Sequence, residues 1–246
     1  MIPLPIDPLL PAIRESLIRS PRLVLVAPPG AGKTTRVPLA LLDSPWLAGR
    51  KIVLLEPRRL AARAAARRMA ATLGERVGET VGYRVHLDTV VGPRTRLEVV
   101  TEGVLTRMLQ GDAALADVGA VLFDEFHERS LHADLGLALT LHAQRLVRED
   151  LRIVVMSATL EGNAVARRID APLLQSEGRA FPVVTHHRAR RDRERVDDGV
   201  VRVTLEAIEA HDGDVLAFLP GAAEIRRVAD RLAQRISDPG IDVRPL

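Results

Sequence analysis

The sequence of 246 residues contains no cysteine, which excludes disulfides and thiolate metal sites and is typical of a reducing compartment. Aromatic residues make up only 2% of the chain, so any nucleic-acid binding should rest on backbone contacts rather than on base stacking. No stretch approaches the roughly 18 uncharged apolar residues of a membrane span, and residues 1–20 do not follow a signal-peptide pattern. We expect a cytoplasmic protein with no membrane partner.

The overall composition is that of a globular protein. Hydrophobic residues make up 47% and charged residues 27%, which is enough for a core and argues against disorder. Lys and Arg exceed Asp and Glu by 35 to 32, so a polyanionic partner is permitted but not required. The length exceeds one typical domain of roughly 100 to 200 residues but falls short of two. A truncated second domain is therefore expected.

Apolar runs alternate with helical patterns along the chain. Short apolar runs predict strands at 23–26, 52–55, 81–85, 97–100, 118–123, 152–156, 173–175, 183–187 and 215–219. Helical patterns occupy 8–18, 37–42, 60–73, 103–109, 134–147, 200–208 and 221–236. This alternation predicts an α/β fold with a doubly wound parallel sheet flanked by helices, whose ligands bind beyond the carboxyl ends of the strands.

The same pattern predicts two domains. Residues 1–178 form the first, 179–196 a linker, and 197–246 the beginning of a second α/β domain with a last short strand-like piece at its end. The linker contains five arginines between 188 and 195. This run fits either a solvated face or an RNA contact.

A phosphate-binding loop follows the first predicted strand. The stretch 27–35 reads Ala-Pro-Pro-Gly-Ala-Gly-Lys-Thr-Thr and opens a helix. Such a loop holds a polyphosphate with backbone N–H groups, with Lys33 on the outer phosphates and the Thr34 hydroxyl as a Mg²⁺ ligand. The predicted nucleotide-binding residues are Gly30, Ala31, Gly32, Lys33, Thr34 and Thr35. A strict motif has glycine in place of Ala27, and a simple Gly/Pro turn is the alternative.

An acidic pair completes the predicted site. Asp124 and Glu125 follow the apolar strand 118–123 directly. Asp124 can hold Mg²⁺ through its water shell, and Glu125 can orient and deprotonate the water that attacks the γ-phosphate. A surface acidic pair is the alternative for these two residues alone. Together with the upstream phosphate loop, they predict an NTPase.

The order of these motifs resembles that of the DEAH-box helicases of superfamily 2. Residues 124–127 read Asp-Glu-Phe-His, similar to motif II with Phe126 in place of alanine. The chain also has segments similar to five other motifs of the family. In the order I, Ia, Ib, III and IV, these are residues 30–35, 57–59, 101–103, 157–159 and 218–221. The resemblance spans nearly the whole chain. It implies a RecA-like first domain, the start of a second RecA-like domain, and Mg²⁺ and ATP as cofactors.

The resemblance also implies roles for residues near the nucleotide. Asp124 and Glu125 would run hydrolysis, and His127 would couple the nucleotide site to the other domain, the alternative being a structural histidine near a helix start. Ser157 and Thr159 would link hydrolysis to domain movement, although they could equally cap a strand end.

Other positions resemble the family's contacts to single-stranded nucleic acid. These are Arg58, Arg59, Thr101 and Gly103, whose guanidinium, hydroxyl and N–H groups suit a phosphate backbone, although Gly103 also fits a helix start. Arg68 falls where related helicases place an arginine on the adenine face, and a solvated charge on an arginine-rich helix is the alternative.

The resemblance predicts an ATP-dependent RNA helicase, with DNA also open as the nucleic acid. A P-loop kinase would not need the motifs at 57–59, 101–103 and 157–159, and a nucleic-acid-binding scaffold with a non-cycling nucleotide site is the remaining class. The family's second domain supplies arginine fingers in a Gln-x-x-Gly-Arg-x-Gly-Arg string, which this sequence does not contain. We therefore expect these 246 residues to bind nucleotide but to hydrolyse it poorly; the sequence does not indicate the oligomeric state.

Overall fold

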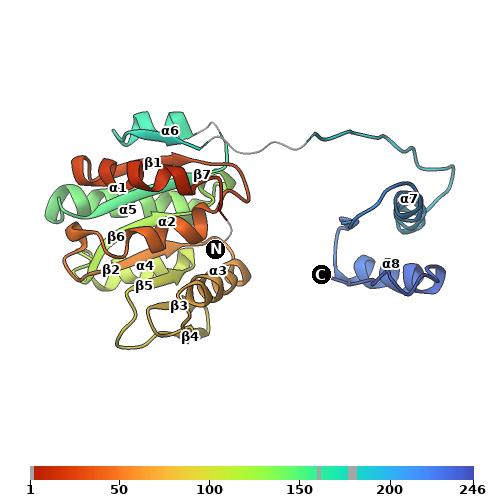
Figure 1. Ribbon diagram of the computed structural model, residues 1–246, viewed down its shortest axis with the longest axis horizontal. Helices are drawn as coiled ribbons and strands as arrows, with labels where there is room; N and C mark the ends of the chain where they lie inside the picture. Colours follow the sequence, from red (N-terminus) through yellow and green to blue (C-terminus); the bar gives the residue numbers. More distant parts are fainter. Residues whose placement is uncertain (1–2, 160–161, 177–181) are drawn as a thin grey trace. The chain divides into compact units, whose positions relative to one another are not determined.

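The structure, a computed structural model, describes residues 3–159, 162–176 and 182–246 (Figure 1). The chain divides into two compact units, residues 1–180 and 181–246. The predicted domain end at residue 178 and the first residues of the predicted linker, 179–181, lie outside the described residues.

A mostly parallel sheet forms the centre of the first unit. Its strands are β1 (Arg22–Val26), β2 (Lys51–Leu55), β3 (Val81–Val85), β4 (Asp88–Val90), β5 (Leu97–Val100), β6 (Val118–Phe123), β7 (Arg152–Ser157) and β8 (Leu173–Gln175). They lie in the order β4-β3-β5-β2-β6-β7-β1-β8. Every neighbouring pair is parallel except β3 with β4. The predicted α/β class with a parallel sheet is confirmed.

Helices cover both faces of this sheet. They are α1 (Leu10–Arg19), α2 (Lys33–Leu41), α3 (Arg59–Thr72), α4 (Glu102–Gly111), α5 (Leu131–Val147) and α6 (Gly162–Arg168), with short 3-10 helices η1 (Asp7–Leu9), η2 (Pro45–Leu47) and η3 (Phe126–Glu128). Successive strand residues point to opposite faces. Leu23 and Leu25 of β1 therefore pack in the core with α1, α2 and α3, whereas Val24 packs in the core with α4, α5 and α6.

Two elements of the first unit were not predicted. Strand β4 pairs with β3 after a turn in which Leu87 has a φ of 61°, and its three residues are too few to show a period. Helix α6 is also short and packs close to β1, because a Cβ on Gly162 would lie 2.4 Å from a methyl carbon of Val26. Short elements like these are set by tertiary contacts rather than by their own pattern.

The second unit contains the helices α7 (Val196–Ala210) and α8 (Ala222–Arg235). Val201, Val228 and Leu232 form its small buried core. The strands predicted at 183–187 and 215–219, and the strand-like piece at the end, are wrong: the described residues of these segments are in no strand. Phe218 is 87% exposed, and a strand needs a neighbour to accept its backbone hydrogen bonds.

Candidate functional site

The predicted site residues gather at the carboxyl edge of the sheet. The phosphate loop follows β1, and Glu56, Thr101 and Asp124 follow β2, β5 and β6, while Ser157 is the last residue of β7. Parallel strands bring all these ends to one edge, although the residues lie far apart in the sequence. The prediction that ligands bind beyond the strand ends depends on this geometry.

The phosphate loop leads into α2, which begins at Lys33. Gly32 at its N-cap has a φ of 96° and no side chain to cap the helix, so the first N–H groups of α2 keep their donors for an anion. Ala27, the departure from the strict motif, is fully buried, and its N–H donates to the Ser157 carbonyl over 3.0 Å. Ala27 therefore anchors the loop to β7.

The N-terminal segment supports the phosphate loop. The N–H of Ile6 donates to the Ala31 carbonyl over 3.1 Å, and the Ile6 side chain is fully buried. Asp7 forms an ion pair with Arg36 of α2 at 3.4 Å. A Cβ on Gly32 would lie 2.6 Å from Leu4. The helix predicted at 8–18 begins after these residues, and their supporting role was not predicted because the contact joins segments distant in the chain.

Two side-chain pairs join the phosphate loop to the end of β6. Lys33, only 3% exposed, forms an ion pair with Glu125 through Nζ and Oε1 at 2.8 Å. The Thr34 hydroxyl donates to the Asp124 carboxylate. A hydroxyl beside a buried carboxylate is the oxygen donor set that Mg²⁺ prefers. These residues therefore fit the predicted magnesium nucleotide site.

A further buried carboxyl group lies beside this pair. Glu56 is 3% exposed, and its burial, together with the charge of Asp124 and a hydrogen bond with it, raises the pKa of Glu56 to about 9. Burial also raises the pKa of Asp124, against the hydrogen bond from Thr34 and the charge of Lys33. Glu56 was not among the predicted site residues, although its place directly after a buried strand was an available signal.

The other residues predicted around the nucleotide also meet here. The N–H of Ala158 donates to Nδ1 of His127 over 3.2 Å, and the same Nδ1 lies 3.3 Å from a Glu125 oxygen. Oγ of Ser157 accepts from the N–H of Thr159 at 3.2 Å, which holds the turn after β7. His127 thus lies between the Glu125 carboxylate and the loop at 157–159.

The residues predicted to bind nucleic acid lie near the segment that follows β6. Arg58 donates to Glu128 over 2.9 Å, and Thr101, nearly buried, is the N-cap of α4. A Cβ on Gly103 would meet open space. Arg59 begins α3, and Arg68 is exposed on that helix about 2.5 turns further on. The nucleic-acid and adenine contacts remain predictions.

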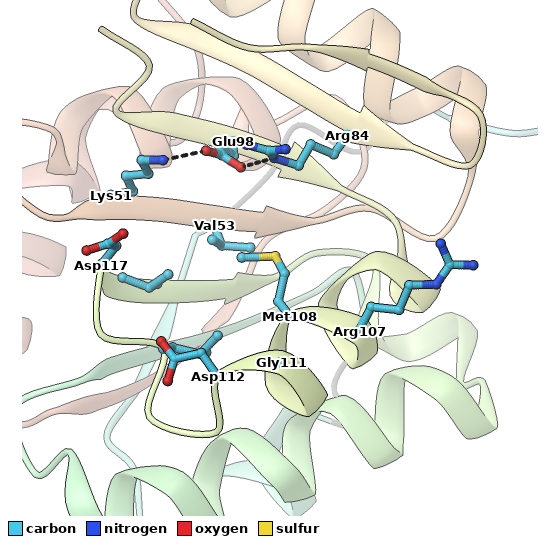
Figure 2. Close-up of a pocket in the computed structure, with 11 residues that line it drawn as sticks. Lys51, Val53, Arg84, Glu98, Arg107, Met108, Gly111, Asp112 and Asp117 are labelled. Carbon is cyan, nitrogen blue, oxygen red and sulfur yellow. Dashed lines mark hydrogen bonds and ion pairs between the residues drawn. The ribbon is translucent and has the colours of Figure 1, made fainter. Parts of the chain in front are cut away.

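A separate pocket of about 340 Å³ lies away from this edge (Figure 2). Glu98 on its wall is almost fully buried between Lys51 at 2.9 Å and Arg84 at 2.7 Å. Burial alone would raise the pKa of Glu98, but the hydrogen bonds from Arg84 and Lys51 outweigh it and lower that pKa. Glu98 is therefore already paired on both sides, with Lys51 and with Arg84.

Residues 11–167 match the DEAD/DEAH box helicase family. The chain belongs to this family. It is 51% identical to the ATP-dependent RNA helicase HrpB of Escherichia coli (strain K12) over 96% of the chain and 29% of that protein. It is 34% identical to a probable ATP-dependent RNA helicase, the DHX35 homolog of Caenorhabditis elegans, over 86% of the chain and 30% of that protein.

The crystal structure of the Escherichia coli DEAH/RHA helicase HrpB superposes with a TM-score of 0.91 at 50% identity, covering 96% of this chain and 30% of that one. The RecA-like fold expected from the family resemblance is therefore confirmed. The string at 124–130, Asp-Glu-Phe-His-Glu-Arg-Ser, pointed to HrpB within the family, and these comparisons confirm that similarity. The chain spans about 30% of the length of these relatives. Among the described residues, no helix is both long and apolar enough to cross a membrane.

Proposed function

We propose that this chain binds Mg-ATP at the carboxyl edge of its sheet and uses it, within a longer protein, to drive an RNA helicase. The main support is the pairing of Lys33 with Glu125 and of Thr34 with Asp124 across the ends of two strands. A loop that only turned the chain would not need four charged or polar side chains joined in this way. RNA, rather than DNA, is favoured because both similar proteins are named as RNA helicases.

The residues divide the work as follows. The N–H groups at the start of α2 and the Lys33 ammonium bind the phosphates, and Thr34 and Asp124 hold Mg²⁺. Mg²⁺ bound there would neutralise charge on the phosphates and position the γ-phosphate for in-line attack by water. Glu125 accepts a proton from the attacking water, and His127 connects that carboxylate to the loop of Ser157 and Thr159.

Single-stranded nucleic acid binds along the loops that follow β2 and β5. Arg58 and Arg59 contact phosphates by charge, and Thr101 and Gly103 contact them by hydroxyl and N–H groups. None of these contacts requires a particular base. Arg68 packs on the adenine, and residues 197–246 begin a second RecA-like domain after the linker 179–196. Hydrolysis by these 246 residues alone is slow, since the arginine-finger string is missing and such a finger is worth roughly 10³ to 10⁵ in rate.

Calorimetric titration with ATP and Mg²⁺ tests the nucleotide site. Lys33→Ala is expected to weaken binding at least about 30-fold, because a charge-assisted hydrogen bond to phosphate contributes about 2 kcal/mol or more. Lys51→Ala, which removes the same charge from the other end of the sheet, is the matched control and should bind as the wild type does. Equal affinity of Lys33→Ala and wild type would refute the assignment of the loop.

Steady-state ATP turnover tests the proposed hydrolysis and its dependence on RNA. ATP hydrolysis by the longer protein should rise when single-stranded RNA is added, and Glu125→Gln should abolish turnover while keeping ATP binding. Brisk RNA-stimulated hydrolysis by the 246 residues alone would overturn the proposed need for a missing arginine finger. Binding without turnover in the longer protein would instead indicate a scaffold with a non-cycling nucleotide site.

A further inference from the structure

The segment 124–130 contacts every loop of the proposed site. Its first residues, Asp124 and Glu125, meet the phosphate loop, and His127 meets the loop after β7. Near its other end, Glu128 pairs with Arg58 at 2.9 Å. Oγ of Ser130 donates to Glu102 at the start of α4 over 2.7 Å. Neither Glu128 nor Ser130 was among the predicted site residues, because their partners lie far away in the chain.

The segment is held in an unusual backbone conformation. Glu125 and Arg129 on either side of the η3 turn have φ of 46° and 47°, a region that residues other than glycine rarely adopt. Phe126 between them is buried, stacks edge-on against Phe123 with ring centroids 6.3 Å apart, and lies under the Arg129 guanidinium. Strained backbone of this kind persists only where its surroundings fix it, and it is concentrated at functional sites.

The Arg58–Glu128 pair is exposed, unlike the pairs around the phosphate loop. The Arg58 side chain is 71% exposed and that of Glu128 is 38% exposed. An exposed ion pair contributes little to stability, so a phosphate can displace the carboxylate at small cost. A carboxylate and a phosphate oxygen satisfy the same guanidinium donors.

We propose that Glu128 occupies Arg58 when no nucleic acid is bound, and that an RNA backbone phosphate displaces it. This inference rests on the proposed function, which places nucleic acid at Arg58. The Glu128 N–H donates to the Glu125 carbonyl over 2.9 Å, so the residue that is displaced belongs to the same turn as the catalytic carboxylate. Glu128 is thus a positioning residue that links the binding of nucleic acid at Arg58 to Glu125.

Binding of a fluorescent single-stranded oligouridine at low salt tests this proposal. Glu128→Gln should bind about two- to five-fold more tightly than wild type, because the competitor for Arg58 is lost. Glu128→Asp keeps the charge and should restore the affinity towards wild type. Glu149→Gln makes the same charge change at the opposite edge of the sheet, where Glu149 is exposed, and should leave the affinity nearly unchanged.

A double-mutant cycle distinguishes competition from a general charge effect. In the Arg58→Gln background, Glu128→Gln should no longer tighten binding. Additive effects of the two substitutions, or unchanged or weaker binding by Glu128→Gln with an unchanged melting temperature, would overturn the proposal while leaving the proposed function intact. Absence of RNA binding by wild type, or wild-type affinity of Arg58→Gln, would refute the nucleic-acid assignment itself, and this inference with it.

The effect of bound RNA on the affinity for Mg-ATP is a separate measurement. A Glu128 side chain with only a structural role would not change it. If bound RNA changes the affinity of wild type for Mg-ATP by some factor, that ratio of affinities should lie closer to one in Glu128→Gln, since residue 128 no longer connects the two sites. An unchanged factor would show that the competition at Arg58 is not transmitted to Glu125, and would overturn that part of the proposal.

Discussion

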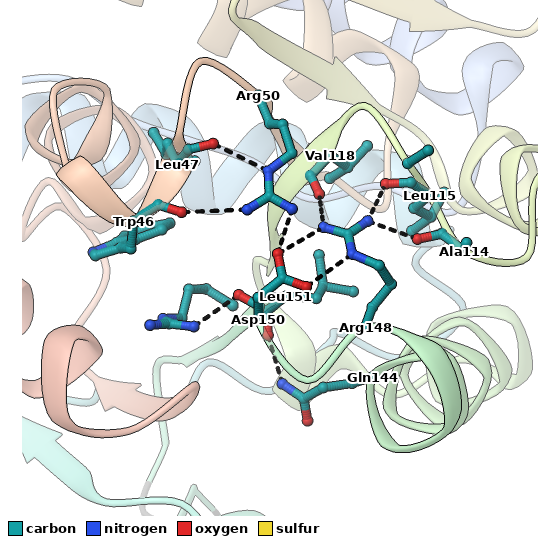
Figure 3. Close-up of polar contacts among 12 residues, drawn as sticks. Trp46, Leu47, Arg50, Ala114, Leu115, Val118, Gln144, Arg148, Asp150 and Leu151 are labelled. Carbon is teal, nitrogen blue, oxygen red and sulfur yellow. Dashed lines mark hydrogen bonds and ion pairs between the residues drawn. The ribbon is translucent and has the colours of Figure 1, made fainter.

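The two edges of the sheet use charged residues in opposite ways. At the carboxyl edge, Lys33 and Arg58 each pair with a carboxylate, which a phosphate replaces in the proposed function. At the amino edge, Arg148 is buried and its donors are used up by the protein itself (Figure 3). It donates to the carbonyls of Ala114, Leu115 and Val118, at 2.6 to 2.8 Å.

Asp150 joins several strands at the amino edge. It accepts from Arg148 at 3.0 Å and also from Arg50, which precedes β2, while the Asp150 carbonyl accepts from Arg152 of β7. Gln144 of α5 adds a hydrogen bond to the Leu151 carbonyl over 2.6 Å. Saturated donors fix the loops in place, and replaceable partners leave a site open to ligands. Binding is therefore expected at one edge and structural support at the other.

Arg148→Met should show most clearly that the amino edge contributes to stability and the carboxyl edge to binding. Removing the guanidinium takes one donor from each of three carbonyls and leaves Asp150 with Arg50, which should lower the free energy of unfolding by about 3–5 kcal/mol. Urea unfolding measures this loss, with Arg145→Met on the exposed part of α5 as the control. Affinity for Mg-ATP in the folded protein should not change. A loss of affinity without a loss of stability would contradict the division of roles.

Two glycines of the phosphate loop sharpen the comparison at the other edge. Gly30→Ala and Gly32→Ala both place a side chain at positive φ, 76° and 96°, which costs about 1 kcal/mol. Only at Gly32 does the new Cβ also meet Leu4, at 2.6 Å. Gly32→Ala should therefore destabilise the fold by about 1–3 kcal/mol, more than Gly30→Ala does. Urea unfolding of both variants tests this, and equal losses would mean that Leu4 simply moves aside.

Asp150→Asn should have a smaller effect that depends on pH. Hydrogen bonds from Arg148 and Arg50 hold the pKa of Asp150 well below its usual value, so its contribution is complete above about pH 5 and is lost as the pH falls below about 4. Because the side chain is 48% exposed, we expect only about 1 kcal/mol at pH 7. Thermal unfolding at pH 7 and pH 3 should show the difference from wild type shrinking in acid. Asp43→Asn, at a 90% exposed side chain, serves as the control.

Most strands of the first unit could be predicted from sequence because they are continuous apolar runs that end in polar residues. The bounds predicted for 81–85, 97–100 and 118–123 match β3, β5 and β6. The motif residues of the nucleotide site follow β1 and β6. Predicting these two strands therefore also placed Lys33 and Thr34 near Asp124 and Glu125.

What sequence could not predict depends on contacts between distant segments. The partnership of Ile6 with Ala31, of Glu128 with Arg58 and of Arg148 with three carbonyls has no local pattern. The strand predicted at 215–219 fails for the related reason that an apolar run becomes a strand only when another strand accepts its hydrogen bonds.

The order of the strands has a consequence for synthesis on the ribosome. Strand β1, which leads into the phosphate loop, pairs only with β7 and β8 among the described strands. Both partners come after residue 151, so β1 is made early and then waits for more than half of the chain before its neighbours emerge. Native pairings of such long sequence separation form slowly. A nascent chain stalled before β7 would expose the unpaired edges of β1, and chaperones that shield apolar strands would be most needed during that interval.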